Sequence, residues 1–421
     1  MDRASRMRRG VAAALFISFA TAFDPTAAGH SLELEEALAR ALHARPELAA
    51  AAAEQRALEA AERQAALPPN PELSLEVEDV AGSGSFSGTS EAQTTLRILQ
   101  PMELGGDRRA RRMLASAHSG LAGFDAEARR LDIAAETNSA FVSVLIAQQE
   151  AHHATELLEL AQREARAAAE RVRAGATLAV EETRARYAVE DARLHEAKGK
   201  LALEATRLQL ASMWGADAPD FDRAEGDLDL VSPPPPLADL VPRLERNPDL
   251  ARFEVERAER QARIDLARAR RIPDPLVVAG VRHLAGPNDA ALVFEVAVPL
   301  PVFDRQQGAI AEAAARASKL DAERATARRH ARIALAAEHA RWASAYSEVV
   351  ILRDRMLPDA KRAFAEVQSA QAAGRVSQLD VLAAWRTEFE TVDRMLHQLG
   401  EYHAARIAVQ RLVGANVEAL Q

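Results

Sequence analysis

The feature that most constrains this chain is a pair of helical patterns far longer than the helices of ordinary globular domains. They run over residues 107–174 and 305–373 and break at Gly175 and Gly374. At 1.5 Å per residue, a helix of this length extends about 100 Å. We therefore predict long antiparallel helices that fold back at glycine tips. Composition agrees, because Ala, Glu, Arg and Leu dominate and aromatic residues make up only 4% of the chain.

The chain also repeats itself, since four landmarks recur in the same order roughly 200 residues later. These pairs are Arg45-Pro46-Glu47-Leu48 with Asn247-Pro248-Asp249-Leu250, Pro69-Asn70-Pro71 with Pro273-Asp274-Pro275, Ala174-Gly175 with Ala373-Gly374, and Trp214-Gly215-Ala216 with Val413-Gly414-Ala415. We predict two repeats, residues 31–218 and 237–417. An acidic, proline-rich linker over residues 219–236 joins them, and its final run of four prolines should be extended.

Each repeat is expected to begin with one helix, which in the first repeat spans Ser31 to Leu67. A pair of segments with alternating apolar and polar residues follows. These segments are residues 73–78 and 92–98 in the first repeat, and 276–283 and 290–298 in the second. Because a period of two is typical of strands, we predict β-hairpins at about 72–101 and 275–300.

Four strands of about ten residues have the length of transmembrane β-strands. They cannot close a barrel alone, because known barrels have at least eight strands and an open edge in lipid is costly. Strands in a membrane would therefore have to be pooled by several chains, and a ring of three would supply twelve. The alternative is a small periplasmic sheet that caps a soluble coiled coil.

The first 28 residues are predicted to be a secretory signal peptide. Four arginines precede an apolar run from Val11 to Phe23, and small residues up to Ala28 suggest a cleavage site there. The run is shorter than the roughly 20 residues that span a bilayer, and a buried N-terminal helix is the alternative. The chain has no cysteine, which excludes disulfides and an N-terminal lipid anchor on cysteine. Its net charge of −9 gives no indication of nucleic-acid binding.

Three motifs resemble the TolC-like outer-membrane factors, and most closely their heavy-metal, CzcC-type branch. The motifs are Pro69-Asn70-Pro71-Glu72-Leu73-Ser74-Leu75-Glu76, Gln100-Pro101-Met102-Glu103-Leu104-Gly105-Gly106-Asp107-Arg108, and Val298-Pro299-Leu300-Pro301-Val302-Phe303-Asp304-Arg305-Gln306-Gln307-Gly308. The resemblance covers essentially the whole mature chain. It implies a mainly α fold with a small β part, in which long antiparallel coiled-coil helices form an α-barrel tunnel. Each chain would add four strands to a trimeric, twelve-stranded transmembrane β-barrel.

The function that the resemblance implies is the exit duct of a tripartite efflux system in the cell outer membrane, with a long periplasmic extension. The implied partners are a homotrimer, a periplasmic adaptor (membrane fusion) protein, an inner-membrane RND transporter and outer-membrane lipid. The implied cargo is divalent heavy-metal cations, conducted passively. Drug efflux and type I secretion are the alternatives, followed by a soluble periplasmic coiled-coil interaction protein.

The two glycine turns are the periplasmic tips that, by resemblance, contact the adaptor. They comprise Ala174, Gly175, Ala176, Thr177, Ala373, Gly374, Arg375, Val376 and Ser377. The alternative is that these residues only form helix turns and contact no adaptor. By resemblance, Asp380 supplies an acidic ring that narrows the tunnel, although the second acidic position of that motif is Ala383 here. The alternative is that Asp380 only caps the helix start together with Ser377.

No motif in the sequence indicates catalysis or a dedicated metal site. There is no P-loop, no GxSxG, and no GxGxxG after a strand. The adjacent His152 and His153 diverge by about 100° on a helix, so they cannot easily share one ion. We expect no enzyme, no cofactor and no resident metal. A periplasmic adaptor would need one helical hairpin within a split β domain, whereas this chain has two hairpins.

Overall fold

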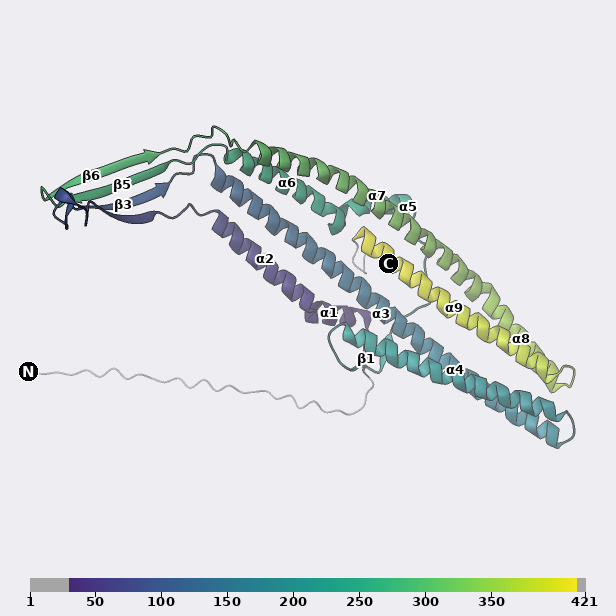
Figure 1. Cartoon of the computed structure of the whole chain (residues 1–421). Helices are drawn as coiled ribbons and strands as arrows, with labels where there is room; N and C mark the ends of the chain where they lie inside the picture. The colour runs from purple at the N-terminus through teal and green to yellow at the C-terminus, as the bar shows by residue number, and fades with distance from the viewer. Residues whose placement is uncertain (1–29, 415–421) are drawn as a thin grey trace, which may run out of the picture.

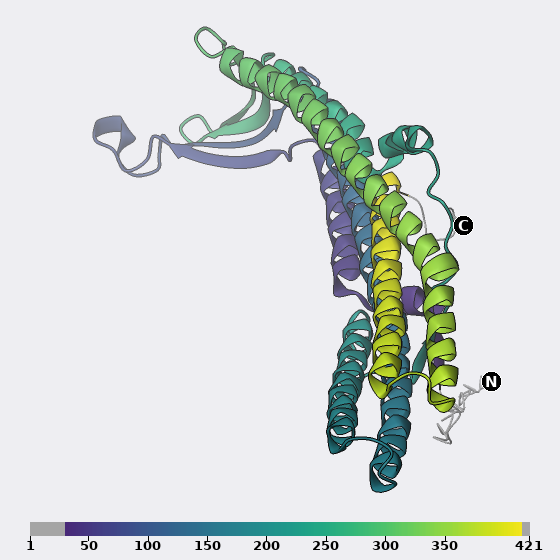
Figure 2. The same ribbon diagram turned by 90° about the vertical axis from the view of Figure 1, so that its right-hand side faces the viewer.

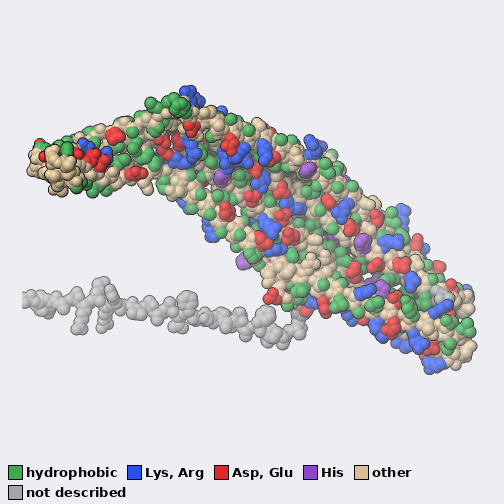
Figure 3. Space-filling view, in the orientation of Figure 1, with side chains coloured by type: hydrophobic (Ala, Val, Ile, Leu, Met, Phe, Trp, Pro, Cys, Tyr) green, Lys and Arg blue, Asp and Glu red, His purple; other side chains and the backbone are tan. Residues whose placement is uncertain are grey.

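The computed structural model describes residues 30–414, which form one long body with a β-sheet at one end and two helical tips at the other (Figure 1). The predicted signal peptide, residues 1–28, lies outside the described residues. Among the residues that are described, no helix combines the length and apolarity needed to cross a membrane. On the face drawn in Figure 3, positive and negative side chains are interleaved along the helical body.

The sheet at one end contains four antiparallel strands in the order β2-β3-β5-β6. Their bounds are β2 (Glu72–Glu78), β3 (Gln93–Pro101), β5 (Leu276–Leu284) and β6 (Asp289–Ala297). The alternating segments are thus confirmed as strands. The two hairpins meet through β3 and β5, where Gln93 lies opposite Leu284 and Pro101 opposite Leu276.

Below the sheet, four helices lie in the order α2-α3-α6-α7, each in contact with the next. They are α2 (Pro46–Ala65), α3 (Asp107–Arg173), α6 (Pro248–Ala269) and α7 (Gln307–Ile351). Toward the tips, α4 (Ala179–Ser212) and α9 (Gln378–Val413) take the places of α2 and α6, and α8 (Leu357–Ala372) continues α7. There the order is α4-α3-α9-α8, and α3 runs the full length (Figure 1).

The single helix expected from Ser31 to Leu67 is wrong. The chain instead forms β1 (Ser31–Glu33), then α1 (Leu34–Ala44), and starts α2 at Pro46. Proline has no N–H to donate, and it disfavours helical geometry in the residue before it. Arg45 accordingly has the extended angles φ −65° and ψ 118° and ends α1.

The linker contains secondary structure that the alternation of apolar and polar residues could not predict. Its strand β4 (Arg223–Glu225) pairs in parallel with β1, so Ser31 lies opposite Arg223. Two short helical turns follow, α5 (Leu237–Leu240) and the 3-10 helix η2 (Val241–Arg246). The buried side chains of Leu32, Phe141 and Phe221 pack in one core that joins β1, α3 and the linker.

The long helix of the second repeat contains a local defect. A π-turn, η3 (Leu352–Met356), separates α7 from α8, and Pro358 lies within the first turn of α8. Proline cannot donate to the carbonyl four residues earlier, and a π-turn is one way to absorb that loss while the helix bends. Figure 2 shows α7 curving over α9 toward this point.

Candidate functional site

One face of the four-stranded sheet is apolar and exposed. The strand register places these apolar residues on it: Leu73, Leu75, Val77, Leu96, Ile98, Val277, Ala279, Val281, Leu292, Phe294 and Val296. Thr94, Gln100 and His283 are the polar residues on this face, near the ends of their strands. Leu75 is 66% exposed and Phe294 75% exposed, values typical of the surface rather than the core. A contiguous apolar face of this kind marks a surface that another apolar phase or molecule covers.

The opposite, polar face carries every Asp, Glu and Arg of the four strands, several of them ion-paired, alongside apolar residues such as Leu99, Val278 and Val293. Arg97 pairs with Glu76 of the neighbouring strand β2. Arg282 donates to Thr95 Oγ1 at 3.0 Å and to Gln93 Oε1 at 3.2 Å, and it lies 3.9 Å from Glu78. The sheet therefore has one face suited to lipid and one suited to water.

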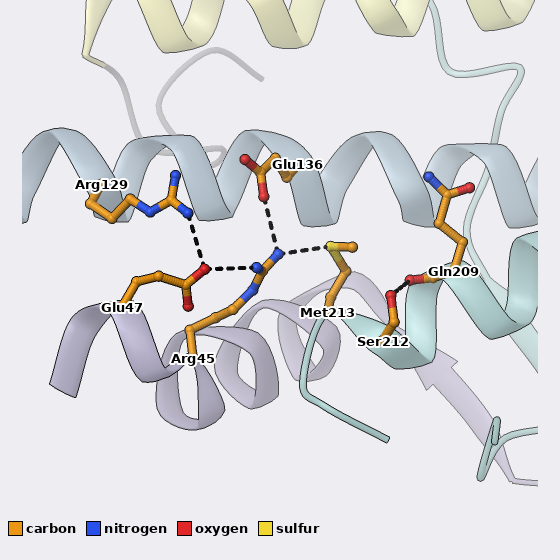
Figure 4. Close-up of polar contacts among 7 residues, drawn as sticks. All are labelled: Arg45, Glu47, Arg129, Glu136, Gln209, Ser212 and Met213. Atoms are coloured by element: carbon orange, nitrogen blue, oxygen red, sulfur yellow. Dashed lines mark hydrogen bonds and ion pairs between the residues drawn. The ribbon is translucent and has the colours of Figure 1, made fainter. Parts of the chain in front are cut away.

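Arg45 fastens the start of α2 to the body of the protein (Figure 4). Its guanidinium donates to Glu47 at 3.2 Å, to Glu136 of α3 at 3.0 Å and to the sulfur of Met213, just after α4, at 3.2 Å. Arg129 of α3 donates to the same Glu47 oxygen at 3.0 Å. One joint thus connects α2, α3 and the end of α4.

Asn247 makes the corresponding joint in the second half. Its side chain accepts from the backbone N–H of Asp249 and so caps α6. Its amide group donates to the carbonyls of Arg411 and Leu412 at 2.7 and 2.9 Å, at the end of α9. In both landmarks, Arg45-Pro46 and Asn247-Pro248, the residue before the proline therefore bonds the start of one helix to the end of another. These pairs are α2 with α4 and α6 with α9. The sequence landmarks did not predict either joint, since their partners lie far away in the chain.

Both helical tips have the same backbone geometry. Gly175 and Gly374 adopt φ angles of +69° and +70°, which favour glycine. At the first tip the N–H of Ala176 bonds to the carbonyl of Arg171, and at the second the N–H of Arg375 bonds to that of Ala370, both at 2.9 Å. In each tip the N–H of the glycine also bonds to a carbonyl three residues earlier, that of Val172 or Gln371. The two bonds together form the Schellman motif. The tip residues named from the sequence thus form two exposed turns at one end of the body.

Asp380 lies one turn into α9 and closes a capping box with Ser377. Its carboxylate accepts from the N–H and the hydroxyl of Ser377 at 2.8 and 2.7 Å. These bonds lower the pKa of Asp380 below its usual value. The cap predicted from the sequence is confirmed, and the carboxylate stays ionised and exposed at the tip end.

Within residues 30–414, no three His, Asp or Glu side chains are placed to hold a metal ion. Histidines gather in a cavity of about 210 Å³ between α3, α4 and α9. There Phe389 stacks on His153, with ring centroids 5.0 Å apart, and meets the edge of His195 at 5.6 Å. Burial lowers the pKa of His153. The aromatic ring touches both imidazoles, so the cluster packs three helices together.

A second buried histidine, His403 on α9, holds the linker in place, and sequence reasoning missed this role. Its Nε2 lies 3.1 Å from the carbonyl oxygen of Leu228, and its side chain is buried, with 4% exposed. The neighbouring Tyr402 hydroxyl bonds to both the N–H and the carbonyl of Ser232. Burial lowers the pKa of His403 to about 4.

The pKa of His403 predicts a loss of stability in acid. Because the folded-state pKa lies below the ordinary 6.5, the stabilisation is complete above pH 6.5. It decreases progressively as the pH falls below 6.5 and is lost once the pH has fallen through about 4. The full loss is about 3 kcal/mol. We expect the Tm of detergent-solubilised protein to fall less between pH 7 and pH 5 in His403→Leu than in the native chain. His43→Leu, at an exposed position, is the control. An equal fall in both variants and the native chain would contradict the assignment.

Comparisons with known proteins place this architecture. A family model described as outer membrane efflux protein matches the chain over residues 37–216 and again over 242–415. The cobalt-zinc-cadmium resistance protein CzcC of Cupriavidus metallidurans is 36% identical over 390 residues, which cover 93% of this chain and 92% of that protein. The nickel and cobalt resistance protein CnrC of the same organism is 29% identical over 76% of each chain.

Solved structures share the fold at low sequence identity. CusC, whose structures concern folding and transmembrane channel formation, superposes with a TM-score of 0.77 at 18% identity, over 91% of this chain and 92% of that one. The open state of the MtrE outer membrane channel of Neisseria gonorrhoeae gives a TM-score of 0.74 at 19% identity, over 91% and 89%. The two-faced sheet and the long helices described above are thus similar to those of outer-membrane channels.

Proposed function

Because the chain belongs to the outer membrane efflux protein family, in the branch of CzcC, we propose that three copies of it form the exit duct of a tripartite efflux system. Proteins of this family are efflux channels rather than enzymes. One observation carries the proposal: the sheet has an exposed apolar face, a polar face and two unpaired edge strands, β2 and β6. Unpaired strand edges are too costly in lipid to persist in a single chain.

The order of the elements supports a ring of identical copies. One edge of the body carries β2, α2 and α4, all from the first half, and the other carries β6, α7 and α8 from the second. A contact between unlike edges is heterologous, and it closes into a ring when the rotation permits. Two copies would supply eight strands, which side chains fill, whereas three supply twelve and leave an open lumen.

An exposed apolar stripe on α4 supports the same contact. Val180, Tyr187, Leu194, Leu201 and Leu208 recur at seven-residue intervals, and all five are exposed. Tyr187 is 72% exposed. A seven-residue apolar repeat on an edge helix is typical of a coiled-coil seam. We assign this seam to the α7–α8 edge of the next copy.

The mass of the native complex tests the proposal. We expect protein extracted in detergent from purified outer membranes to be a homotrimer. A monomer, or recovery of the protein in the soluble periplasm, would favour the soluble coiled-coil interaction protein instead. Four strands with open edges could not then form a channel.

The tips are proposed to meet the other components of the system. In this proposal a periplasmic adaptor docks on the exposed turns at residues 174–177 and 373–377, and an inner-membrane RND transporter supplies the driving force. Cross-linking from the tips in cells tests it, and the chain is suited to this because it contains no cysteine. A cysteine at Ala176 should capture an adaptor-sized partner, and one at Leu230 in the linker should not.

Asp380 is proposed as the gate of the tunnel. Three copies would bring three carboxylates to one level near the tips, where they attract cations and repel one another. We expect Asp380→Asn to change single-channel conductance and cation selectivity in planar bilayers. Ser377→Ala is the matched control, because it removes the cap partner but keeps the charge. Equal effects of the two substitutions would reduce the role of Asp380 to capping, and no effect of Asp380→Asn would exclude the gate.

The proposed cargo is divalent heavy-metal cations. Two relatives carry names that state resistance to cobalt, zinc and cadmium, or to nickel and cobalt. Deletion of the gene should therefore increase sensitivity to these metals, and the native chain should restore tolerance. Sensitivity to drugs alone would favour drug efflux, and loss of a secreted protein would favour type I secretion.

A further inference from the structure

The polar face of the sheet carries an unequal number of charges. By the strand register it holds five carboxylates and two guanidinium groups. The acidic residues are Glu72, Glu76, Glu78, Asp289 and Glu295, and the basic residues are Arg97 and Arg282. The face therefore carries an excess of negative charge. The effect of this excess on ions in a pore depends on whether each charged group is paired at the wall or free to face the pore.

Arg97 is held flat against the sheet by the neighbouring strands. It lies between Ser74 and Gly280 in the register and pairs with Glu76. A Cβ at Gly280 would come within 2.8 Å of Arg97 Cγ, and within 2.5 Å of the Leu96 carbonyl oxygen. Because Gly280 has no side chain, the aliphatic part of the Arg97 side chain can lie directly over it.

Arg282 is also held against the wall. Its bonds to Thr95 and Gln93 occupy two of its nitrogens, and Glu78 faces a third. The hydroxyl side chain of Thr95 beneath it is fully buried, although it lies on an open sheet. Both positive charges of this face are therefore compensated and kept close to the backbone.

Glu72, Asp289 and Glu295 are different, because none of them makes an ion pair or a side-chain hydrogen bond with the described residues. All three are exposed. Glu72 and Glu295 lie in the same row of the sheet, at opposite edges and toward its helical end, whereas Asp289 lies at the other end of β6. Fixed charges on the wall of a low-dielectric pore concentrate ions of opposite sign.

We propose that the polar face of the sheet selects for cations, because its two arginines are held against the wall while Glu72, Asp289 and Glu295 are left unpaired. This inference rests on the proposed function, since it requires that face to line a channel. Arg97 and Gly280 then contribute to selectivity, because together they keep the positive charge of Arg97 at the wall and away from the pore. The substrate class is then mobile cations in general, without a bound ion.

Reversal potentials of single trimers in planar bilayers under a KCl gradient test the inference. The native channel should prefer K⁺ to Cl⁻. Glu72→Gln with Glu295→Gln should lower that preference roughly threefold. Arg97→Gln should raise it, because Glu76 then loses its partner. Glu225→Gln is the control, because Glu225 lies on β4 in the separate β1–β4 sheet, and it should leave the selectivity unchanged.

The outcomes separate this inference from the function on which it rests. A native channel that conducts, but whose selectivity is unchanged in the double variant, would overturn the inference and leave the duct intact. A decrease on Arg97→Gln would also overturn it. A native trimer that carries no current would overturn the proposed function and this inference with it. Trimer mass, measured for each variant, identifies any that fails to assemble.

Discussion

Substituting arginine for Leu75 is expected to keep the protein out of the outer membrane, whereas arginine at the adjacent Ser74 should be tolerated. Leu75 lies on the apolar face opposite Leu96, and Ser74 lies on the polar face opposite Arg97. Arginine facing lipid at mid-membrane costs about 2–4 kcal/mol in a barrel. A trimer incurs this cost three times, so the total is comparable with the whole stability of many domains.

The two variants form a matched pair, because they differ by one position and therefore only in the face of the sheet. We expect most Leu75→Arg protein to be lost from the outer-membrane fraction, and Ser74→Arg to appear there at near-native levels. Fractionation followed by quantitative immunoblotting provides the measurement. Equal loss of both would point to a general folding defect, and loss of Ser74→Arg alone would reverse the assignment of the faces.

Glutamate at Leu194 and Leu201 together is expected to abolish the trimer. Both side chains belong to the exposed stripe of α4, which we assign to the seam between copies. Burying a leucine contributes about 1.5–3 kcal/mol, and the double variant removes two leucines from each of three seams while adding like charges. Native mass spectrometry in detergent should detect a monomer in place of the trimer.

Leu230→Glu is the control for the seam variant. Leu230 is also an exposed leucine, at 69%, but it lies in the linker and outside the stripe. It should remain trimeric. If the Leu194 and Leu201 variant also stayed trimeric, α4 would not form the seam, and its stripe would have to face another partner.

Much of the fold could be predicted from local patterns. The strands appear as a period of two, and the tips appear because Gly175 and Gly374 can adopt positive φ angles. The restart of α9 appears in the spacing of Ser377 and Asp380. Each of these features depends on residues within a few positions of one another, so the sequence displays it directly.

Other features could not be predicted, because they depend on contacts between distant residues or on small differences in local conformational free energy. The β1–β4 ladder joins Ser31 to Arg223, and three-residue strands leave no period to detect. Pro46 breaks the first helix although the apolar pattern continues past it. The burial of His403 against Leu228 depends on where the linker crosses α9.

By itself, the sequence determined the element types, their order and repetition, the turn chemistry of the tips and the family, because these follow from local conformational preferences and from residue identities. Only the tertiary structure decided which ends are joined, which edges are left open, and which charges are paired. Arg45 reaching Met213, Arg97 lying over Gly280, and Glu72 lacking a partner are all relations across the fold. Burial, hydrogen bonding and ion pairing act through space, and so they become visible only once distant segments have been brought together.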